Sequence, residues 1–204
     1  DIVDLFLKRC GIYDYSFSEC RSLKQIFIPS SITTIGNYAF VSCSSLIIVS
    51  IPTSVVTIGN GAFKECTSLV KITIPSSVTS FGQSVFLGCT SLSQVSIPTS
   101  LTEIHERTFS GCSSLVHPFT IPSSVKSIGK YAFSGCSMLT QIQIPSSVNS
   151  IEEGAFFFCE KLEKVGIPAS VSSIGEAVFE KCTSLKQIKI PASVVEIKGN
   201  IFKG

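Results

Sequence analysis

The sequence has no tryptophan, few charged side chains and no long apolar run. Aspartate occurs only at Asp1, Asp4 and Asp14, and histidine only at His105 and His117. Charged residues make up 15% of the 204, and the net charge is only +2. This balance excludes a nucleic-acid binder that works through a dense basic face. No segment approaches the roughly 20 apolar residues that span a bilayer, so we expect no membrane insertion within this chain.

Apolar residues, in contrast, are abundant. They form 44% of the sequence, and the mean hydropathy is +0.45. This composition excludes a disordered chain and is enough for a sizeable core. The chain does not begin with Met and has no signal-like segment at its start, so we expect that it was cut or processed and that a targeting segment could have been removed.

Three columns of residues share one period of 23, with a single step of 24. The first column is formed by cysteine: Cys20, Cys43, Cys66, Cys89, Cys112, Cys136, Cys159 and Cys182. The second is formed by phenylalanine: Phe17, Phe40, Phe63, Phe86, Phe109, Phe133, Phe156, Phe179 and Phe202. Ile-Pro pairs form the third, from Ile28-Pro29 to Ile190-Pro191. A fixed period of this length predicts a solenoid, a propeller or an array of repeats.

One unit, residues 69–91, has the general form L-x-x-I-x-I-P-x-S-V-x-x-I-G-x-x-A-F-x-x-C-x-S. Its first six residues alternate as a strand does, and the proline then ends the hydrogen bonding. A short second segment follows, and we expect G-x-x-A-F-x-x-C to form a single helical turn. One unit buries too little apolar surface to offset the cost of ordering 23 residues, so stacking in parallel register is compulsory. We therefore predict parallel strands in one sheet, with every phenylalanine of the column buried.

The unit resembles the 23-residue repeats of the BspA-like leucine-rich repeat family. L-x-x-I-x-I matches the strand signature of leucine-rich repeats, and the A-F-x-x-C block is typical of the BspA-like subclass. The position after the strand, usually Asn or Cys, is Ser here. The resemblance implies an α/β leucine-rich-repeat solenoid of about eight to nine rungs, with a parallel β-sheet on its concave face. It also implies adhesion to host matrix proteins such as fibronectin and fibrinogen, without catalytic residues.

The ends and one insertion depart from this period. We expect 1–204 to form a single solenoid, with 1–19 a degenerate first repeat and 203–204 a truncated end. Neither end resembles a polar cap, which favours a fragment of a longer array over a short protein that stacks on a partner. The 24-residue step comes from Val116–Phe119, where an extra residue and Pro118 predict a bulge and a break in the ladder. Neutral drift, a ligand contact and a bend in the solenoid remain as its explanations.

Enzymatic and metal-binding motifs are lacking. His105 lies in a column that is usually glycine, and we expect it in a solvated turn without φ > 0. His117 lies in the predicted bulge, and the sequence lacks the G-x-S-x-G, H-E-x-x-H and Walker-type patterns. Zinc sites place cysteines in pairs two to four residues apart, unlike this column. We expect no cofactor and no metal, but free, buried thiols, with Cys10 the most reactive.

The variable strand positions form the candidate partner-binding face. One end is apolar, the middle is small and polar, and the last rungs gather lysines. The candidate residues are Phe27, Ile48, Lys71, Gln94, Pro118, Thr120, Gln141, Gln143, Lys164, Lys186 and Lys189. A merely solvated sheet is the alternative interpretation of the same residues.

The sequence thus favours a non-enzymatic protein-binding module at a cell surface or outside the cell. The partner would be a protein whose identity the sequence does not give. An intracellular scaffold along a filament or the cytoskeleton, with a cytoplasmic location, is the alternative. The scarcity of surface charge also allows end-to-end self-association.

Overall fold

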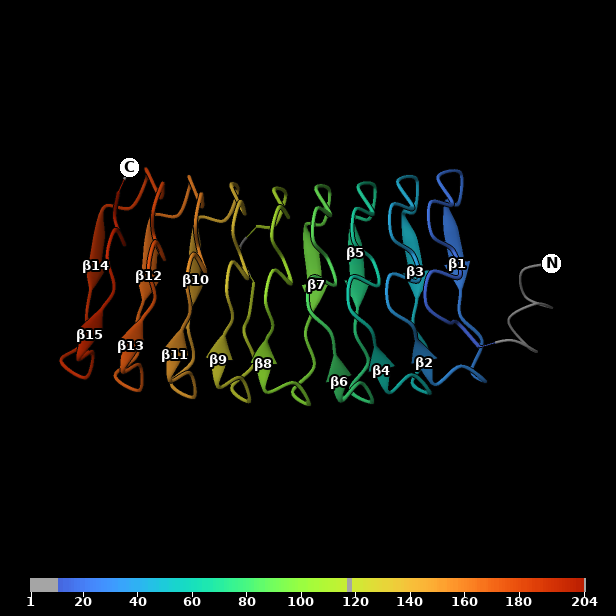
Figure 1. Cartoon of the computed structure of the whole chain (residues 1–204), viewed down its shortest axis with the longest axis horizontal. Helices are drawn as coiled ribbons and strands as arrows, with labels where there is room; N and C mark the ends of the chain where they lie inside the picture. Colours follow the sequence, from blue (N-terminus) through green and yellow to red (C-terminus); the bar gives the residue numbers. More distant parts are fainter. Residues whose placement is uncertain (1–10, 117–118, 204) are drawn as a thin grey trace.

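The structure is a computed structural model, and it describes residues 11–116 and 119–203. The chain winds as a solenoid whose turns lie side by side from the N-terminal to the C-terminal end (Figure 1). Ile12 pairs in parallel with Ile35, 23 residues later, so the start of the described chain already follows the register of the repeat.

Two columns of short strands run along the solenoid. The strands of the first column have three residues: β1 (Gln25–Phe27), β3 (Ile48–Ser50), β5 (Lys71–Thr73), β7 (Gln94–Ser96), β10 (Gln141–Gln143), β12 (Lys164–Gly166) and β14 (Gln187–Lys189). Those of the second column have two: β2 (Thr34–Ile35), β4 (Thr57–Ile58), β6 (Ser80–Phe81), β8 (Glu103–Ile104), β9 (Ser127–Ile128), β11 (Ser150–Ile151), β13 (Ser173–Ile174) and β15 (Glu196–Ile197). In each first-column strand the middle side chain is buried or partly buried and the outer two are exposed, which is the alternation read from the sequence.

All strand pairs are parallel, and partners are one repeat apart. The parallel solenoid is therefore confirmed, but the prediction of one sheet is wrong. The first column is divided into β1–β3, β5–β7 and β10–β12–β14, and the second into β2–β4–β6 and β8–β9–β11–β13–β15. The first column has seven described strands and the second has eight, and the count of eight to nine rungs stays unconfirmed. The concave position of the sheet stays a prediction.

The described residues contain no helix, so the α part of the α/β prediction is not confirmed. The segment expected to form a helical turn holds two residues in the left-handed region, four positions apart. In one turn these are Tyr38, with φ 53°, and Ser42, with φ 58°. Left-handed residues cannot continue a right-handed helix, so the chain changes direction at each of them.

This left-handed segment joins neighbouring turns instead. The N–H groups of Tyr38, Phe40 and Ser42 donate to carbonyl groups of the next turn, over N–O distances of 2.7 to 2.8 Å. The same donors recur from turn to turn along the solenoid. A third hydrogen-bonded ladder thus runs beside the two strand columns.

The core is built around the phenylalanine column. Consecutive rings are stacked, with centroids 5.1 to 5.9 Å apart, from Phe17 to Phe202. The seven rings from Phe40 to Phe179 are buried. The prediction that every ring is buried is wrong at the two ends, because Phe17 is only partly buried and Phe202 is 47% exposed. A terminal ring has a neighbouring turn on one side only.

A column of serines completes the backbone hydrogen bonding after the first-column strands. The hydroxyl of Ser54 donates to the carbonyl oxygen of Ile32 in the preceding turn, at 2.7 Å. Equivalent bonds are made by Ser77, Ser100, Ser124, Ser147, Ser170 and Ser193. Within the described chain every buried side-chain nitrogen and oxygen has a partner. A short hydroxyl is enough because the carbonyl of the preceding turn lies directly beside it.

The glycine column reflects close approach between turns. No glycine of this column has positive φ, as the sequence led us to expect. A Cβ on Gly36 would lie 2.4 Å from the Tyr13 backbone, and one on Gly82 would lie 2.4 Å from the Asn60 backbone. Larger residues such as His105 and Glu152 in the same column therefore require a local shift of the neighbouring turn.

The inserted residue lies between β7 and β10, at Val116–Phe119, and the predicted bulge and break there stay a prediction. Among the described residues, β7 pairs with β5, and Thr120 forms a single bridge to Gln143. Phe119 is buried, and its ring stands edge-on against Phe109 and Phe133, 5.5 and 5.3 Å from them. His117 and Pro118 lie outside the described residues.

Removing one ring from the middle of the stack should cost far more stability than removing one at its end. We expect Phe156→Ala to lower the free energy of unfolding by about 3–5 kcal/mol, because it leaves a cavity between two stacked rings. Phe202→Ala should cost less than about 1.5 kcal/mol, because its ring is half exposed. Urea denaturation followed by circular dichroism measures both. Similar losses in the two variants would show that the stack does not form the stabilising core.

Candidate functional site

The candidate residues gather on one side of the solenoid, which we call the strand face. It consists of the outer two residues of each first-column strand and the residue immediately before each strand. Phe27 is 63% exposed and Ile48 is 49% exposed. The other described candidates are also exposed: Lys71, Gln94, Thr120, Gln141, Gln143, Lys164, Lys186 and Lys189. Of the candidates, only Pro118 lies outside the described residues.

Parallel register arranges this face in straight rows. Gln141, Lys164 and Gln187 are consecutive partners, and Gln143, Gly166 and Lys189 form the row beside them. Neighbouring strands are about 4.8 Å apart, so residues 23 positions apart in sequence become immediate neighbours.

An apolar hollow opens on the strand face between β3 and β5. It has a volume of about 880 Å³, and its exposed apolar side chains are Phe27, Ile47, Ile48 and Val70. No backbone hydrogen bond of the described chain joins β3 to β5, whereas β4 and β6 of the same two turns remain paired. These two turns are therefore hydrogen-bonded through their second-column strands and not through their first-column strands.

Val70 and Lys24, like Ile47, are exposed residues of the strand face that are not among the predicted candidates. Both occupy the position directly before a strand, as Ile47 and Lys186 do, and both are exposed. Their place in that column was the signal that could have included them. The hollow itself has no signal in the sequence, since both flanking units keep the strand pattern, as L-x-x-V-x-I at 46–51 and L-x-x-I-x-I at 69–74.

A second hollow of about 410 Å³ lies beside β7, next to the inserted residue. Val116 and Phe119 line it together with β7, and it shares Lys71, Ile72 and Thr73 with the first hollow. The two hollows therefore adjoin along the strand face.

Lysines gather at the C-terminal end of the strand face. Lys186 forms an ion pair with Glu163, with 3.2 Å between Nζ and Oε2. Lys164 and Lys189 form no ion pair with any described residue. Gly166 lies two residues after Lys164 and is the strand partner of Lys189, and an added Cβ there would have no atom within 4 Å. Two free ammonium groups thus stand beside open space.

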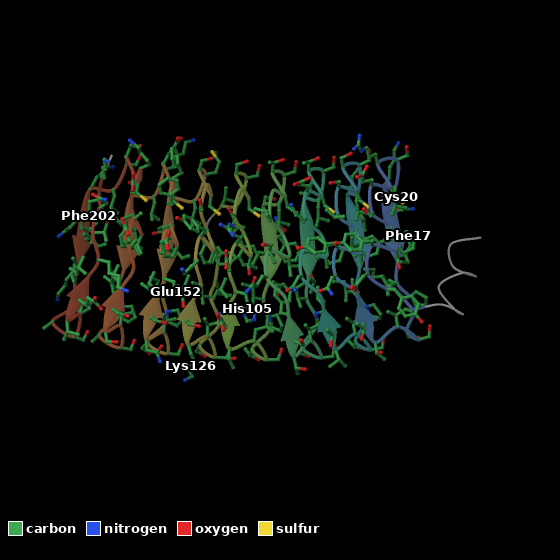
Figure 2. The ribbon with its side chains drawn as sticks, in the orientation of Figure 1. Phe17, Cys20, His105, Lys126, Glu152 and Phe202 are labelled. Carbon is green, nitrogen blue, oxygen red and sulfur yellow. The ribbon has the colours of Figure 1, made fainter. Side chains whose placement is uncertain are left out.

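The second-strand side carries carboxylates instead. Glu152, Glu153, Glu176 and Glu196 line a hollow of about 510 Å³ there, with Lys130 and Lys198. Lys126 and Glu152 lie on this side in Figure 2, and Lys126 points away from the ribbon. In the described residues, no three His, Cys, Asp or Glu side chains come together as a metal site.

Two further contacts between ionisable side chains lie on the second-strand side. The Tyr131 hydroxyl donates to Glu153 at 2.7 Å, which lowers the pKa of that carboxyl and raises the pKa of Tyr131. His105 is partly exposed, with its Nδ1 3.5 Å from Glu103 Oε1. Neither contact holds a nucleophile beside a base.

The cysteine column forms a row of free thiols, visible as sulfur atoms along the axis in Figure 2. The seven from Cys43 to Cys182 are buried. Each donates its S–H to a phenylalanine carbonyl of the preceding turn, as Cys89 does to Phe63 at 3.0 Å. Burial raises the pKa of Cys43 to about 11 and that of Cys89 and Cys182 to about 12. These thiols therefore stay protonated and unreactive at neutral pH.

Cys20 is the exception in this column. It is exposed, so the prediction of buried thiols throughout the column is wrong at this position. No preceding turn of the described chain covers it, whereas Cys43 is covered by the turn that contains Phe17. Cys10, predicted to be the most reactive, lies outside the described residues.

The sequence profile of the BspA type leucine rich repeat region matches residues 11–118 and 113–204, in six copies. The chain belongs to the BspA-type leucine-rich repeat family. Leucine-rich repeats generally mediate protein–protein interactions and are generally not enzymes, so the match favours an interaction module. No curated protein matches the chain. No helix of the described residues is long and apolar enough to cross a bilayer.

Solved leucine-rich repeat proteins share the fold of this BspA-type chain. A protein from T. pallidum (TpLRR) is 30% identical, with a TM-score of 0.57, over 86% of this chain and 71% of that one. One from Eubacterium ventriosum is 27% identical, with a TM-score of 0.75, over 89% of this chain and 48% of that one. The present chain thus spans about half the length of the latter. The pneumococcal vaccine antigen PcpA shares the fold at 20% identity, with a TM-score of 0.63, over 90% of this chain and 56% of that one.

Thiol labelling should separate Cys20 from the buried column. In the native protein we expect Cys20 to react with a maleimide, and Cys43 to Cys182 to react only after denaturation, because burial excludes the reagent and keeps those thiols protonated. Peptide mapping by mass spectrometry assigns each label, and a Cys20→Ser variant should lose the native one. Native labelling at Cys89 or Cys112 would contradict the buried column.

The buried thiols should also make the protein sensitive to alkali. Unfolded thiols ionise near their ordinary pKa of 9.0, whereas Cys89 in the folded chain ionises only near 12. Its contribution to stability is therefore complete below pH 9 and is lost as the pH rises from 9 to 12, by about 1.4 kcal/mol per pH unit. Urea denaturation at several pH values should give a shallower decline for Cys89→Ala than for the unmodified chain. This comparison cancels the ionisation of Lys and Tyr, and equal slopes would contradict the linkage.

Proposed function

We propose that the chain is a non-enzymatic protein-recognition module that binds its partner through the strand face. The observation that carries this proposal is the exposure of Phe27, Ile47, Ile48 and Val70 around one hollow. Contiguous exposed apolar groups are uncommon on a monomer and typically mark an interaction site. The parallel register places polar and basic side chains beside them in regular rows, which a partner can contact without rearrangement of the solenoid.

The cellular role that we propose is adhesion at a cell surface, with extracellular matrix proteins as partners. This step comes from the resemblance to BspA-like repeats, which implies fibronectin and fibrinogen as ligands. An intracellular scaffold in a cytoplasmic location stays the alternative. In that case, the strand face would contact a filament protein, and the chain would not bind matrix proteins.

The proposed binding face can be tested by reversing the charge of exposed lysines on the strand face and of an exposed lysine elsewhere. Immobilised fibronectin and fibrinogen serve as probes, and surface plasmon resonance measures the affinity of the chain. We expect Lys164→Glu combined with Lys189→Glu to weaken binding about tenfold, because two exposed attractions become repulsions. Both side chains point to solvent, so the urea midpoint should not change.

Lys126→Glu is the matched control for this experiment. Lys126 is equally exposed but lies on the second-strand side, in no ion pair of the described chain. The control should bind as the unmodified chain does. If Lys126→Glu weakens binding and the double variant does not, the strand face is not the site. Absence of binding to both probes would argue against adhesion to matrix proteins.

A further inference from the structure

The strand face carries two chemically different ends. Its N-terminal end surrounds the hollow between β3 and β5, and its C-terminal end carries the free ammonium groups of Lys164 and Lys189. We infer that the face takes an extended acidic segment of a partner protein, with an apolar side chain in the hollow and carboxylates on the two lysines. This inference rests on the proposed function and specifies the chemistry of the partner.

The apolar end provides a place for one anchoring side chain. Because β3 and β5 are not hydrogen-bonded, the two turns leave a hollow of about 880 Å³ between them. Phe27 and Ile48 border the hollow, and they are 63% and 49% exposed. An inserted apolar side chain would remove these surfaces from water, which is favourable in proportion to the area buried. Anchors of this kind usually dominate binding to a groove.

The basic end provides the charge. Along the described strand face the cations are Lys24, Lys71, Lys164, Lys186 and Lys189, and the only carboxylate is Glu163, which is already paired with Lys186. Gly166 follows Lys164 by two residues and pairs with Lys189 on the next strand, and an added Cβ there would meet no atom within 4 Å. A partner that carries carboxylates meets attraction here, whereas a basic partner meets repulsion.

The distance between the two ends fixes the spacing of the ligand. From the gap between β3 and β5 to the middle of β12 and β14 is five turns, or about 24 Å at about 4.8 Å per strand. An extended chain covers about 3.4 Å per residue, so about seven residues separate the anchor from the carboxylates. The adjoining hollow beside β7 lies on the path between them.

Three synthetic peptides test this arrangement by fluorescence anisotropy with the whole chain. The spaced peptide carries Leu-Phe, then seven Ser/Thr residues, then three Glu. The compact peptide has the same composition with two residues between the groups, and the basic peptide has Lys in place of Glu. We expect the spaced peptide to bind about tenfold more tightly than either other peptide, because only it reaches both ends with the right charge. Added salt should reduce that preference.

Variants of the chain assign each end. Ile48→Gln should weaken the spaced peptide about fivefold, and Val195→Gln, a matched change at an apolar residue that is 87% exposed on the second-strand side, should not. Lys164→Glu with Lys189→Glu should remove the preference for the spaced peptide. Gly166→Glu should do the same, because its side chain has room beside both lysines. Lys126→Glu should leave the preference unchanged.

The outcomes distinguish this inference from the proposed function. If Ile48→Gln weakens binding but spacing and lysine reversal have no effect, the acidic segment is wrong and the strand face stands as the site. If only Val195→Gln and Lys126→Glu weaken binding, the acidic segment and the strand face as the binding site are both wrong. Absence of saturable binding by the spaced peptide overturns the acidic segment, whatever fibronectin and fibrinogen do. Self-association that Ile48→Gln abolishes in sedimentation would identify a second copy of the chain as the occupant, and would also overturn it.

Discussion

Backbone hydrogen bonding from each turn to the next is the constraint on which the rest of this structure depends. It runs along the first strand column, the second strand column and the left-handed segment. Because donors and acceptors meet one repeat apart, every column of the sequence becomes a line of stacked side chains. The phenylalanine rings, the thiols and the serine hydroxyls all occupy such lines. A single turn has no partner for these groups, which is why the array is stable only as a stack.

The candidate site arises where this hydrogen bonding is incomplete. Between β3 and β5 the first column opens, while the second column and the left-handed ladder keep the same two turns together. Such a local opening removes few hydrogen bonds and leaves the phenylalanine stack continuous. It therefore creates a hollow on one face without dividing the solenoid. Beside the insertion at Val116–Phe119, Phe119 is buried in the core, and Val116 and Phe119 line the second hollow.

The few charges of the chain are distributed unevenly around it. Lysines predominate on the strand face, and the carboxylates from Glu103 to Glu196 lie mostly on the second-strand side. The net charge of +2 does not reveal this separation of lysines from carboxylates. In a chain with so few ionised groups, two unpaired lysines beside open space are a large part of the local field.

The sequence by itself determined the family, the register, the buried columns and the residues of the strand face. These follow from a period of 23, since equal spacing in the chain becomes direct contact in the stack. Only the tertiary structure decided that G-x-x-A-F-x-x-C forms the left-handed segment and no helix. The pattern alone fits a helical turn, but in the structure its N–H groups donate to carbonyl groups of the neighbouring turn. The break between β3 and β5 and the exposure of Cys20 and Phe202 were likewise decided by what packs beside each turn. The repeat specifies which residues one turn contains, whereas the hydrogen bonds and the burial of those residues depend on the neighbouring turns.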